Sequence, residues 1–273
     1  KINVGLAIKK TNLRLNKNFL NIYYNFIYIK IIIKVMNYLI LVRHGQSIWN
    51  LEKRFTGWVD IDLTDKGKFE AEKAGILIKE RKISLDLYYS SYQKRANNTL
   101  KIIQKVMGDN KNFTRAWELN ERHYGALTGL NKIEMMDKLG EDRVHEFRRS
   151  WDTKPEPLDR NSIYHPNNIN TYNELPRDII PDTESLKNTY ERVVNYFKKE
   201  INEKLKIKKN ILVSAHGNSI RALCKYLFKL DNIQISKLEI PTGNPLIIKF
   251  SENNEIIDCE YLDKERSKSL LVF

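Results

Sequence analysis

Two short, continuous apolar runs along the chain each end in a His-Gly pair. Residues 38–42 are Tyr-Leu-Ile-Leu-Val and precede Arg43-His44-Gly45, and residues 211–213 are Ile-Leu-Val and precede Ser-Ala-His216-Gly217. Apolar runs of this length without alternation are typical of strands that are buried on both faces of a parallel sheet. After His216, apolar residues recur at helical spacing. The pattern therefore predicts, twice, a buried strand followed by a His-Gly turn and the start of a helix.

Further periodic segments extend this α/β pattern. Residues 85–89 and 246–250 are two more candidate strands, and a helix that carries Arg95 follows the first of them. Thr64 is a candidate N-cap for a helix that runs toward residue 81. After Asp182-Thr183, apolar residues between 186 and 205 recur with a period of 3.6 and predict a long amphipathic helix.

Residues 152–182 contain five of the seven prolines and many asparagines, which makes regular structure there improbable. A loop of this length inside a compact domain is usually functional or disordered. Residues 36–273 contain no repeat, no heptad and no clean linker, so we expect them to form one domain.

Residues 1–35 differ in composition from the rest of the chain, with seven Lys and Arg and no acid. Asn21, Asn25 and Lys30 interrupt the apolar run, which is therefore shorter than a membrane-spanning helix requires. A signal peptide has a cleavage site of small residues, and none precedes Met36. A transit peptide is rich in Ser and Arg, whereas residues 1–35 contain no Ser and one Arg. We expect a basic, Asn/Ile-rich extension outside the catalytic fold, with Met36 as the functional start. Targeting or membrane contact, and packing onto the domain, are the alternatives.

Composition narrows the class of protein. The chain has 273 residues, 41% of them hydrophobic and 30% charged, which favours a globular protein over a disordered or multispanning one. Its net charge of +13 indicates an anionic partner, although +7 of this lies in residues 1–35. The remaining charges of both signs are interspersed, so we expect no nucleic acid. Two cysteines are too few for a disulfide framework and favour a reducing cytoplasm; Cys224 is expected in the core.

The strand ends carry the candidate chemistry. In open α/β sheets, ligands bind beyond the carboxyl ends of the strands, where helix N-termini present unpaired N–H groups. His44, His216, Arg43 and Arg95 all follow predicted strand ends, and imidazole with guanidinium suits a phosphoryl group. A neutral imidazole can attack phosphorus and form a phosphohistidine, with a carboxyl group as proton donor and acceptor. Structural histidines remain an alternative, and so does a metal site, although HExxH and closely spaced ligand sets are absent.

Longer motifs resemble a known family. Arg43-His44-Gly45 with Ser47 and Trp49-Asn50 resembles the signature of the histidine phosphatase superfamily, and within it the chain is similar to the cofactor-dependent phosphoglycerate mutases. The similarity covers residues 38–262, and residues 120–125, Asn-Glu-Arg-His-Tyr-Gly, are its most specific part. The other blocks that match in order are Arg54-Phe55-Thr56-Gly57-Trp58, Lys94-Arg95-Ala96, Gly129-Leu130-Asn131-Lys132, Arg148-Arg149, Thr183-Glu184-Ser185-Leu186, Ala215-His216-Gly217-Asn218-Ser219 and Ile240-Pro241-Thr242-Gly243.

The resemblance implies a three-layer α/β sandwich with a mostly parallel central sheet flanked by helices, and a single catalytic domain over 36–273. It implies interconversion of 3-phosphoglycerate and 2-phosphoglycerate, primed by 2,3-bisphosphoglycerate and without a metal, in a cytoplasmic homodimer or homotetramer. The substrates would be small phosphorylated molecules, with no stable membrane insertion. A bisphosphoglycerate synthase or a phosphatase of the same superfamily is the alternative.

The same resemblance implies the role of individual residues. His44 would be the phosphorylated nucleophile and Glu121 the general acid and base. Arg43, Arg95, His216 and Asn50 would hold the transferring phosphoryl group. The rest of the substrate would be contacted by Thr56, Gly57, Tyr124, Lys132, Arg148, Arg149 and Asn218.

Plainer roles and departures from the family remain open. Glu121 can instead pair with Arg122 or Lys132 on a surface loop, and Arg148-Arg149 can form a solvated helix face. Gln46 stands where many members have Glu, and Tyr92-Gln93 is expected to change only local packing. The tail after residue 262 is short, so we expect water to reach the phosphohistidine more readily and phosphatase leakage to rise.

Overall fold

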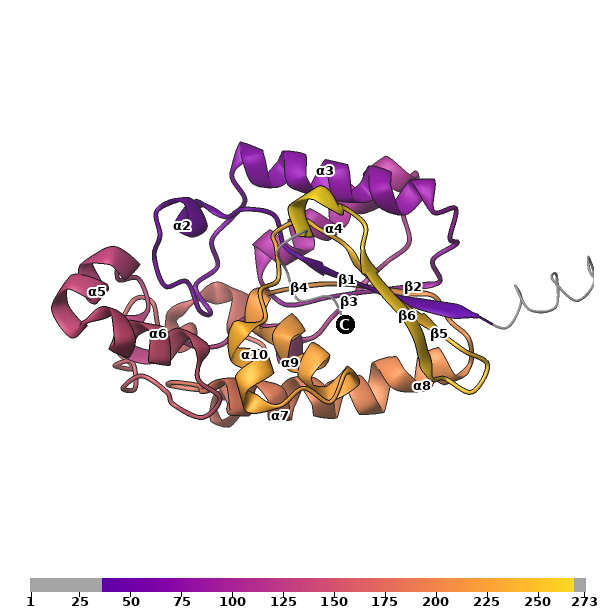
Figure 1. The fold of residues 1–273 in the computed structure, drawn as a ribbon. Helices are drawn as coiled ribbons and strands as arrows, with labels where there is room; N and C mark the ends of the chain where they lie inside the picture. Colours follow the sequence, from indigo (N-terminus) through magenta and orange to yellow (C-terminus); the bar gives the residue numbers. More distant parts are fainter. Residues whose placement is uncertain (1–35, 268–273) are drawn as a thin grey trace, which may run out of the picture. The chain divides into compact units, whose positions relative to one another are not determined.

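The computed structural model describes residues 36–267, so the predicted extension 1–35 and the last six residues of the C-terminal tail lie outside the described residues. A six-stranded sheet with the order β3-β2-β4-β1-β5-β6 forms the centre of this part (Figure 1). The first four strands in this order run parallel, and β5 and β6 are antiparallel additions. The strands are β1 (Asn37–Arg43), β2 (Leu87–Ser90), β3 (Thr114–Arg115), β4 (Ile211–Ala215), β5 (Leu246–Phe250) and β6 (Ile256–Tyr261).

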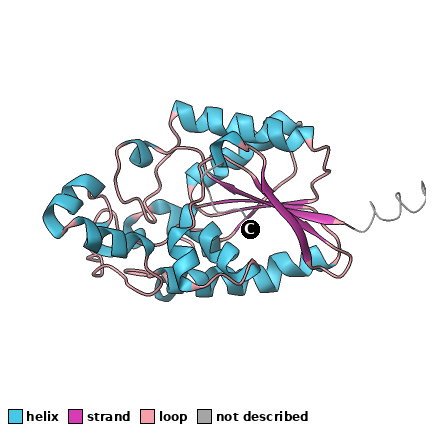
Figure 2. Ribbon diagram, in the orientation of Figure 1, coloured by secondary structure: helices cyan, strands magenta, loops and turns pink. Residues whose placement is uncertain are grey.

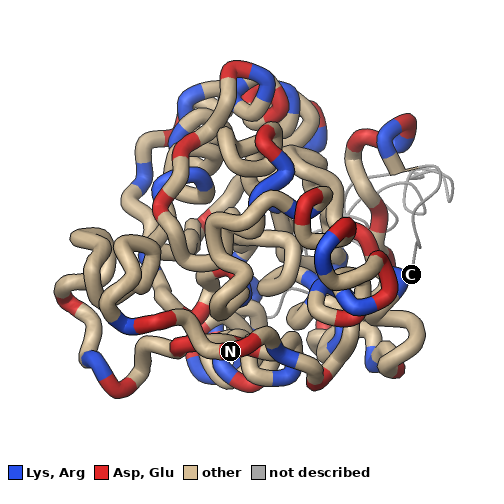
Figure 3. The backbone as a smooth tube through the Cα atoms, turned by 90° about the vertical axis from the view of Figure 1, so that its left-hand side faces the viewer, with Lys and Arg blue, Asp and Glu red and all other residues tan. Residues whose placement is uncertain are grey.

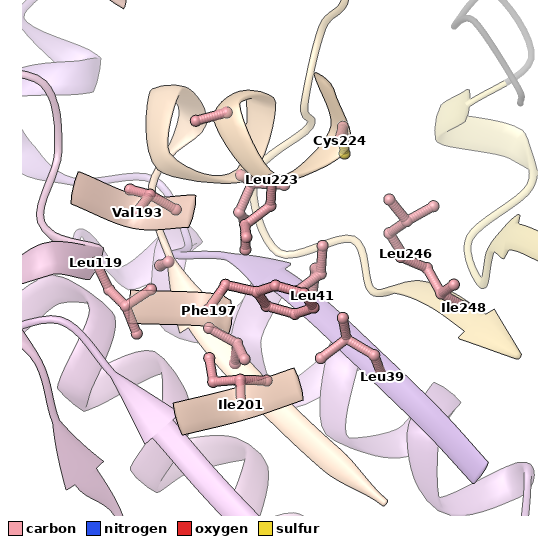
Figure 4. Packing of buried hydrophobic residues seen from close by; sticks show 14 of the residues in the cluster. Leu39, Leu41, Leu119, Val193, Phe197, Ile201, Leu223, Cys224, Leu246 and Ile248 are labelled. Carbon is pink, nitrogen blue, oxygen red and sulfur yellow. The ribbon is translucent and has the colours of Figure 1, made fainter. Parts of the chain in front are cut away.

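Helices cover both faces of the sheet (Figure 2). Alternate residues of β1 point to opposite faces, because successive side chains of a strand do. Ile40 and Val42 belong to the core cluster under α3 (Asp65–Glu80) and α4 (Lys94–Met107). Leu39 and Leu41 belong to the core on the other face (Figure 4). That face is covered by α7 (Leu186–Tyr196), a π-helical segment (Phe197–Ile201), α8 (Asn202–Lys206) and α9 (Gly217–Leu227). The predicted three-layer sandwich is confirmed.

Local predictions hold with two adjustments. Thr64 caps α3 as expected, because its hydroxyl accepts the backbone N–H of Gly67 at 3.1 Å. The predicted strand 85–89 forms at Leu87–Ser90 instead, since the backbone N–H of Asp86 donates to the Asn210 carbonyl ahead of the ladder. The helix predicted after residue 183 is interrupted by the π-helical segment at Phe197–Ile201, yet its apolar stripe stays buried.

Shorter elements surround the carboxyl ends of the parallel strands. They are α2 (Ile48–Leu51), α5 (Lys132–Leu139), α6 (Glu141–Arg149), α10 (Asn232–Lys237) and the single 3₁₀ turns Trp117–Leu119, Gly125–Leu127 and Glu265–Ser267. Residues 152–182 contain neither α-helix nor strand, as predicted, and form only the 3₁₀ turns Pro166–Asn168, Asn170–Tyr172 and Arg177–Ile179. The loop is nevertheless packed, because Tyr172, Leu175 and Ile180 form a buried cluster with Trp58.

The described residues can be compared with the predictions on charge, membrane segments and Cys224. Segments with Lys or Arg and segments with Asp or Glu are interspersed along the backbone (Figure 3). Among residues 36–267, no helix is long and apolar enough to cross a membrane. Cys224 is fully buried in the core cluster, as expected for a small core residue.

Candidate active site

The carboxyl ends of β1 and β4 bring two histidines together. The strands pair in parallel with Arg43 opposite Ala215, and the backbone N–H of His44 donates to the Ala215 carbonyl at 3.0 Å. The next residue of each strand is a histidine, and the ring centroids of His44 and His216 lie 5.0 Å apart with an interplanar angle of 61°. The two His-Gly turns therefore form one site.

The His44 ring is fixed in one tautomer. Its Nδ1 lies 2.7 Å from the carbonyl oxygen of Gly45, and because a carbonyl only accepts, Nδ1 carries the hydrogen. Nε2 therefore keeps its lone pair, toward which Arg95 Nε donates at 3.3 Å. Burial, followed by the charges of Arg95 and Arg43, holds the pKa of His44 well below its ordinary value. A buried, neutral imidazole whose Nε2 carries no hydrogen can act as a nucleophile.

The His216 ring is held at its other nitrogen, Nε2. Ser91 Oγ lies 2.8 Å from His216 Nε2 and also accepts the backbone N–H of Gln93 at 3.1 Å. When the hydroxyl of Ser91 donates its hydrogen to Nε2, the ring hydrogen of His216 lies on Nδ1. Nδ1 is buried without a partner among the described residues. Burial and the Arg95 charge hold the pKa of His216 well below its ordinary value. An unpartnered buried donor in a polar site is available to a ligand oxygen.

Glu121 has one anchored and one free carboxylate oxygen. Its Oε1 accepts the backbone N–H of Arg122 at 2.7 Å and two N–H groups of Asn218, the backbone at 3.3 Å and Nδ2 at 2.8 Å. Its Oε2 accepts no hydrogen bond from residues 36–267. The side chain is 9% exposed and forms no ion pair with Arg122 or Lys132, so the plainer role of a surface ion pair is wrong.

Gln93 joins the two halves of the site. Its Nε2 donates to the Gly57 carbonyl at 2.8 Å, and its Oε1 accepts the backbone N–H of Glu121 at 3.0 Å. Arg95 Nη2 donates to the same Gly57 carbonyl at 2.9 Å. The expectation that Tyr92-Gln93 changes only local packing is therefore wrong, because Gln93 positions the Glu121 backbone. Gln46 points elsewhere, and its side-chain oxygen accepts from the hydroxyl of Thr64 at 3.0 Å.

A cavity of about 130 Å³ lies over these groups. Twelve of the thirteen predicted site residues line it, and the thirteenth, His216, does not, although its ring lies 5.0 Å from that of His44. The twelve are Arg43, His44, Asn50, Thr56, Gly57, Arg95, Glu121, Tyr124, Lys132, Arg148, Arg149 and Asn218. The prediction missed Gly217, Arg221, Glu239 and Ile240. The i, i+3 spacing of Asn218 and Arg221 on one helix face was the available signal for Arg221.

The far wall of the cavity is cationic. Lys132 Nζ donates to the Arg54 carbonyl at 2.6 Å, and burial lowers the pKa of Lys132 to about 8. Arg149 forms an ion pair with Glu239, whereas Arg148 has no ion-pair partner within residues 36–267. Both arginines line the cavity, so the alternative of a solvated helix face is wrong.

Comparison with known proteins assigns the family. The sequence profile of the histidine phosphatase superfamily (branch 1) matches residues 39–165 and 161–260. The chain is 65% identical over 238 residues to the 2,3-bisphosphoglycerate-dependent phosphoglycerate mutase of Pelagibacter ubique, which covers 87% of this chain and 100% of that protein. The chain belongs to the histidine phosphatase superfamily and, within it, to the 2,3-bisphosphoglycerate-dependent phosphoglycerate mutases.

Other members of the family agree. Proteins of the same name from Borreliella burgdorferi and Xylella fastidiosa are each 46% identical, over 83% and 82% of this chain and 92% and 90% of their own lengths. Among solved structures, a phosphoglycerate mutase from Bacillus anthracis has a TM-score of 0.59 at 22% identity, over 82% of this chain and 92% of that one. A putative α-ribazole-5′-P phosphatase from Escherichia coli has a TM-score of 0.63 at 18% identity, over 87% and 99%. These two structures share the superfamily fold.

The donor set of this mutase-family site suits a polyanion. Six cationic side chains line the cavity against two acids, and the lining includes the buried, unpartnered Nε of Arg43. These donors fit the phosphates and carboxylate of 2,3-bisphosphoglycerate. The described residues contain no group of three or more His, Cys, Asp or Glu side chains that could hold a metal ion.

Proposed function

We propose that this phosphoglycerate mutase interconverts 3-phosphoglycerate and 2-phosphoglycerate through a phosphohistidine at Nε2 of His44. The observation that carries the proposal is the pairing of a neutral His44, whose Nε2 is free, with a buried carboxylate, Glu121, whose Oε2 is free. A nucleophile and a proton carrier on one cavity are what two-step phosphoryl transfer requires.

The chemistry divides between these residues. 2,3-Bisphosphoglycerate supplies the phosphoryl group that primes His44. In that transfer His44 Nε2 forms a bond to phosphorus and the bond from phosphorus to the glycerate oxygen breaks. Glu121 enters the step as a carboxylic acid, donates the proton on Oε2 to that oxygen and leaves as the carboxylate. His44 keeps its Nδ1 hydrogen on the Gly45 carbonyl throughout. In the reverse transfer Glu121 takes the proton of the substrate hydroxyl that attacks phosphorus.

The remaining predicted residues would bind the negatively charged groups of the substrate. Arg43, Arg95, His216 and Asn50 would stabilise the oxygens of the transferring phosphoryl group, because preorganised donors are most effective in a buried site. Arg95 is suited to this task, since Nη1 and Nη2 are already held by the Val59 and Gly57 carbonyls at 2.8 and 2.9 Å. The substrate carboxylate and second phosphate would contact Thr56, Gly57, Tyr124, Lys132, Arg148, Arg149 and Asn218.

One assay tests the function against its rivals. Turnover of 3-phosphoglycerate is measured with and without 2,3-bisphosphoglycerate, in excess chelator. We expect chelator-resistant turnover that depends on the bisphosphate, whereas a synthase would accumulate 2,3-bisphosphoglycerate and a phosphatase would release phosphate. Cofactor-independent, chelator-sensitive turnover would overturn the mechanism.

Labelling locates the nucleophile. Incubation with ³²P-labelled 2,3-bisphosphoglycerate should give acid-labile label in the native protein and none in His44→Ala. Label that survives in the variant places the nucleophile elsewhere.

The setting is part of the same proposal. We propose a cytoplasmic enzyme that forms a homodimer or homotetramer and needs no metal. Light scattering of the purified full chain gives its mass, and a monomer at micromolar concentration would contradict the oligomer.

A further inference from the structure

Arg221 of α9 is a buried cation without a carboxylate partner among the described residues. It is 3% exposed. Its Nη1 donates to Asn218 Oδ1 at 2.9 Å, and its Nη2 donates to the backbone carbonyl of Ile235. Its Nε has no partner in the same part of the chain. Burying a guanidinium without a carboxylate partner costs free energy of folding, which suggests that Arg221 has a role in the site.

The contact with Asn218 determines which way an amide faces. An asparagine side chain has one acceptor and one donor end, and rotation by 180° exchanges them. Because Arg221 only donates, Oδ1 must face it, and Nδ2 then points to the opposite side. There Nδ2 donates to Glu121 Oε1 at 2.8 Å and to the Tyr124 hydroxyl at 3.1 Å. The flipped amide would place Oδ1 against the Glu121 carboxylate, and two acceptors repel.

The anchored Oε1 leaves Oε2 as the free carboxylate oxygen of Glu121. Gly217 lies next to this oxygen, since a Cβ built on the glycine would be 3.8 Å from Glu121 Oε2. We infer that Arg221 is a positioning residue that fixes the amide of Asn218 and, through it, presents Glu121 Oε2 to the substrate oxygen as the atom that gives and takes the proton. The inference rests on the proton-transfer role proposed for Glu121.

The test is a double-mutant cycle on the full-length protein, with turnover of 3-phosphoglycerate at saturating 2,3-bisphosphoglycerate. Arg221→Met should lower kcat about 10- to 100-fold, with a smaller change in KM, because a mispositioned proton carrier affects the transfer step. In the Glu121→Gln background, Arg221→Met should lower kcat by less than about twofold, since residues that act through one another are not additive. Lys225→Met is the matched control. It also removes a cation of α9, one that donates to the Leu230 carbonyl, and it should leave kcat unchanged.

The outcomes separate the two hypotheses. A Glu121→Gln variant with native turnover contradicts the proposed function. An impaired Glu121→Gln combined with an unimpaired Arg221→Met overturns only the positioning role, and so does a full additional loss in the double variant. A rise in KM alone would make Arg221 a substrate contact and would also overturn the inference.

Folding is controlled separately. Thermal unfolding of each variant shows whether it is native. If Arg221→Met does not fold, Arg221→Lys takes its place in the cycle, because it keeps a charge and one donor. The expectation is then a smaller loss in kcat that again disappears in the Glu121→Gln background, and additivity again overturns the inference.

Discussion

The imidazoles of His44 and His216 are held at different ring nitrogens, which prepares them for different tasks. The Gly45 carbonyl takes the hydrogen of His44 and frees Nε2, whereas the Ser91 hydroxyl occupies Nε2 of His216 and frees the N–H. Two histidines with similar burial thus become a nucleophile and a hydrogen-bond donor through one contact each.

Glu121→Gln tests the proton carrier. The amide keeps the shape of the side chain but cannot protonate the leaving oxygen, so we expect kcat to fall about 10²- to 10⁴-fold. Steady-state turnover of 3-phosphoglycerate measures this. A rate within twofold of the native protein would remove Glu121 from the chemistry.

Ser91→Ala tests the tautomer of His216. Without the hydroxyl, Nε2 loses its partner and the hydrogen is free to move to it, which withdraws the donor from the phosphoryl group. We expect kcat to fall about tenfold, the equivalent of one hydrogen bond. Ser90→Ala is the matched control, because that hydroxyl donates to the Ser214 carbonyl and does not contact His216. Equal losses in both variants would argue against the tautomer.

Sequence reasoning at this scale found residue types but not their partners. His44 and His216 follow from strand ends, and most of the cationic wall from motif resemblance. Ser91 and Gln93 were missed as site residues because they contact His216 and Glu121 across 125 and 28 positions of the chain. Only the folded backbone brings such groups within hydrogen-bond distance.

At the scale of elements, α7 supports the loop that carries Glu121. Arg192 of α7 donates to the carbonyls of Glu118, Asn120 and Glu121 at 2.6, 3.0 and 3.0 Å. It also forms an ion pair with Glu184 at 2.7 Å, in which both side chains are almost fully buried. A single arginine therefore connects α7 to three backbone carbonyls within residues 118–121, next to the site.

Arg192→Met should lower the free energy of unfolding by about 3–5 kcal/mol, because it leaves the Glu184 charge buried without its partner. Chemical denaturation monitored by circular dichroism measures this. Lys206→Met is the control, since it breaks an ion pair with Glu203 that is half exposed on both sides, and should change stability by less than about 1 kcal/mol. A loss below about 1 kcal/mol in Arg192→Met would contradict the supporting role.

Sequence patterns predict most of the helices and strands but not their irregularities or the packing of loops. Four of the six strands, β1, β2, β4 and β5, follow from the hydrophobic pattern, and the Thr64 cap follows from capping chemistry. The strands β3 and β6 were not predicted. The π-helical segment at Phe197–Ile201 was not predicted, because the 3.6 period was applied as for an uninterrupted α-helix. The packed state of residues 152–182 was also missed, since prolines exclude helix and strand but do not reveal that Tyr172 packs against Trp58.

At the scale of the whole molecule, buried neutral histidines link stability to pH. Burial lowers the pKa of His123 to about 3, from an ordinary value of 6.5, and the pKa values of His44 and His216 are lowered as well. Between pH 6.5 and 3 the unfolded chain binds protons that the folded protein does not. The free energy of unfolding should therefore be greatest above pH 6.5 and fall as the pH drops, by up to about 1.4 kcal/mol per pH unit for each such group.

Denaturation of the native protein and of His123→Gln, at a series of pH values from 7 to 4, measures this. The variant should show a shallower decline, because one of the linked groups is gone. An identical slope in the two proteins would contradict a depressed pKa at His123.

The charge of the molecule bears on substrate capture. A groove of about 700 Å³ shares Arg43, Lys132 and Arg148 with the catalytic cavity and adds Lys53 and Lys66. The side chains of Lys53 and Lys66 have no ion-pair partner in the described part of the chain. Unpaired cations beside a site raise the rate at which anions arrive, and salt screens them.

The double variant Lys53→Gln/Lys66→Gln should lower kcat/KM for 3-phosphoglycerate about threefold or more at low salt, with little change in kcat, and the difference should vanish near 1 M salt. Lys101→Gln/Lys105→Gln removes two exposed charges from α4 and is the control. A salt-independent loss, or an equal loss in the control, would contradict the role of the groove.

The register of β1 against β4 has one more consequence. Hydrogen-bonded strands lie about 4.8 Å apart, and the two imidazoles that follow them are 5.0 Å apart. The parallel pairing of β1 and β4 therefore brings the nucleophile and its neighbouring donor together at adjacent strand ends. Changes in the surrounding loops can therefore alter which phosphate ester is admitted while the phosphorus-handling pair keeps its dimensions.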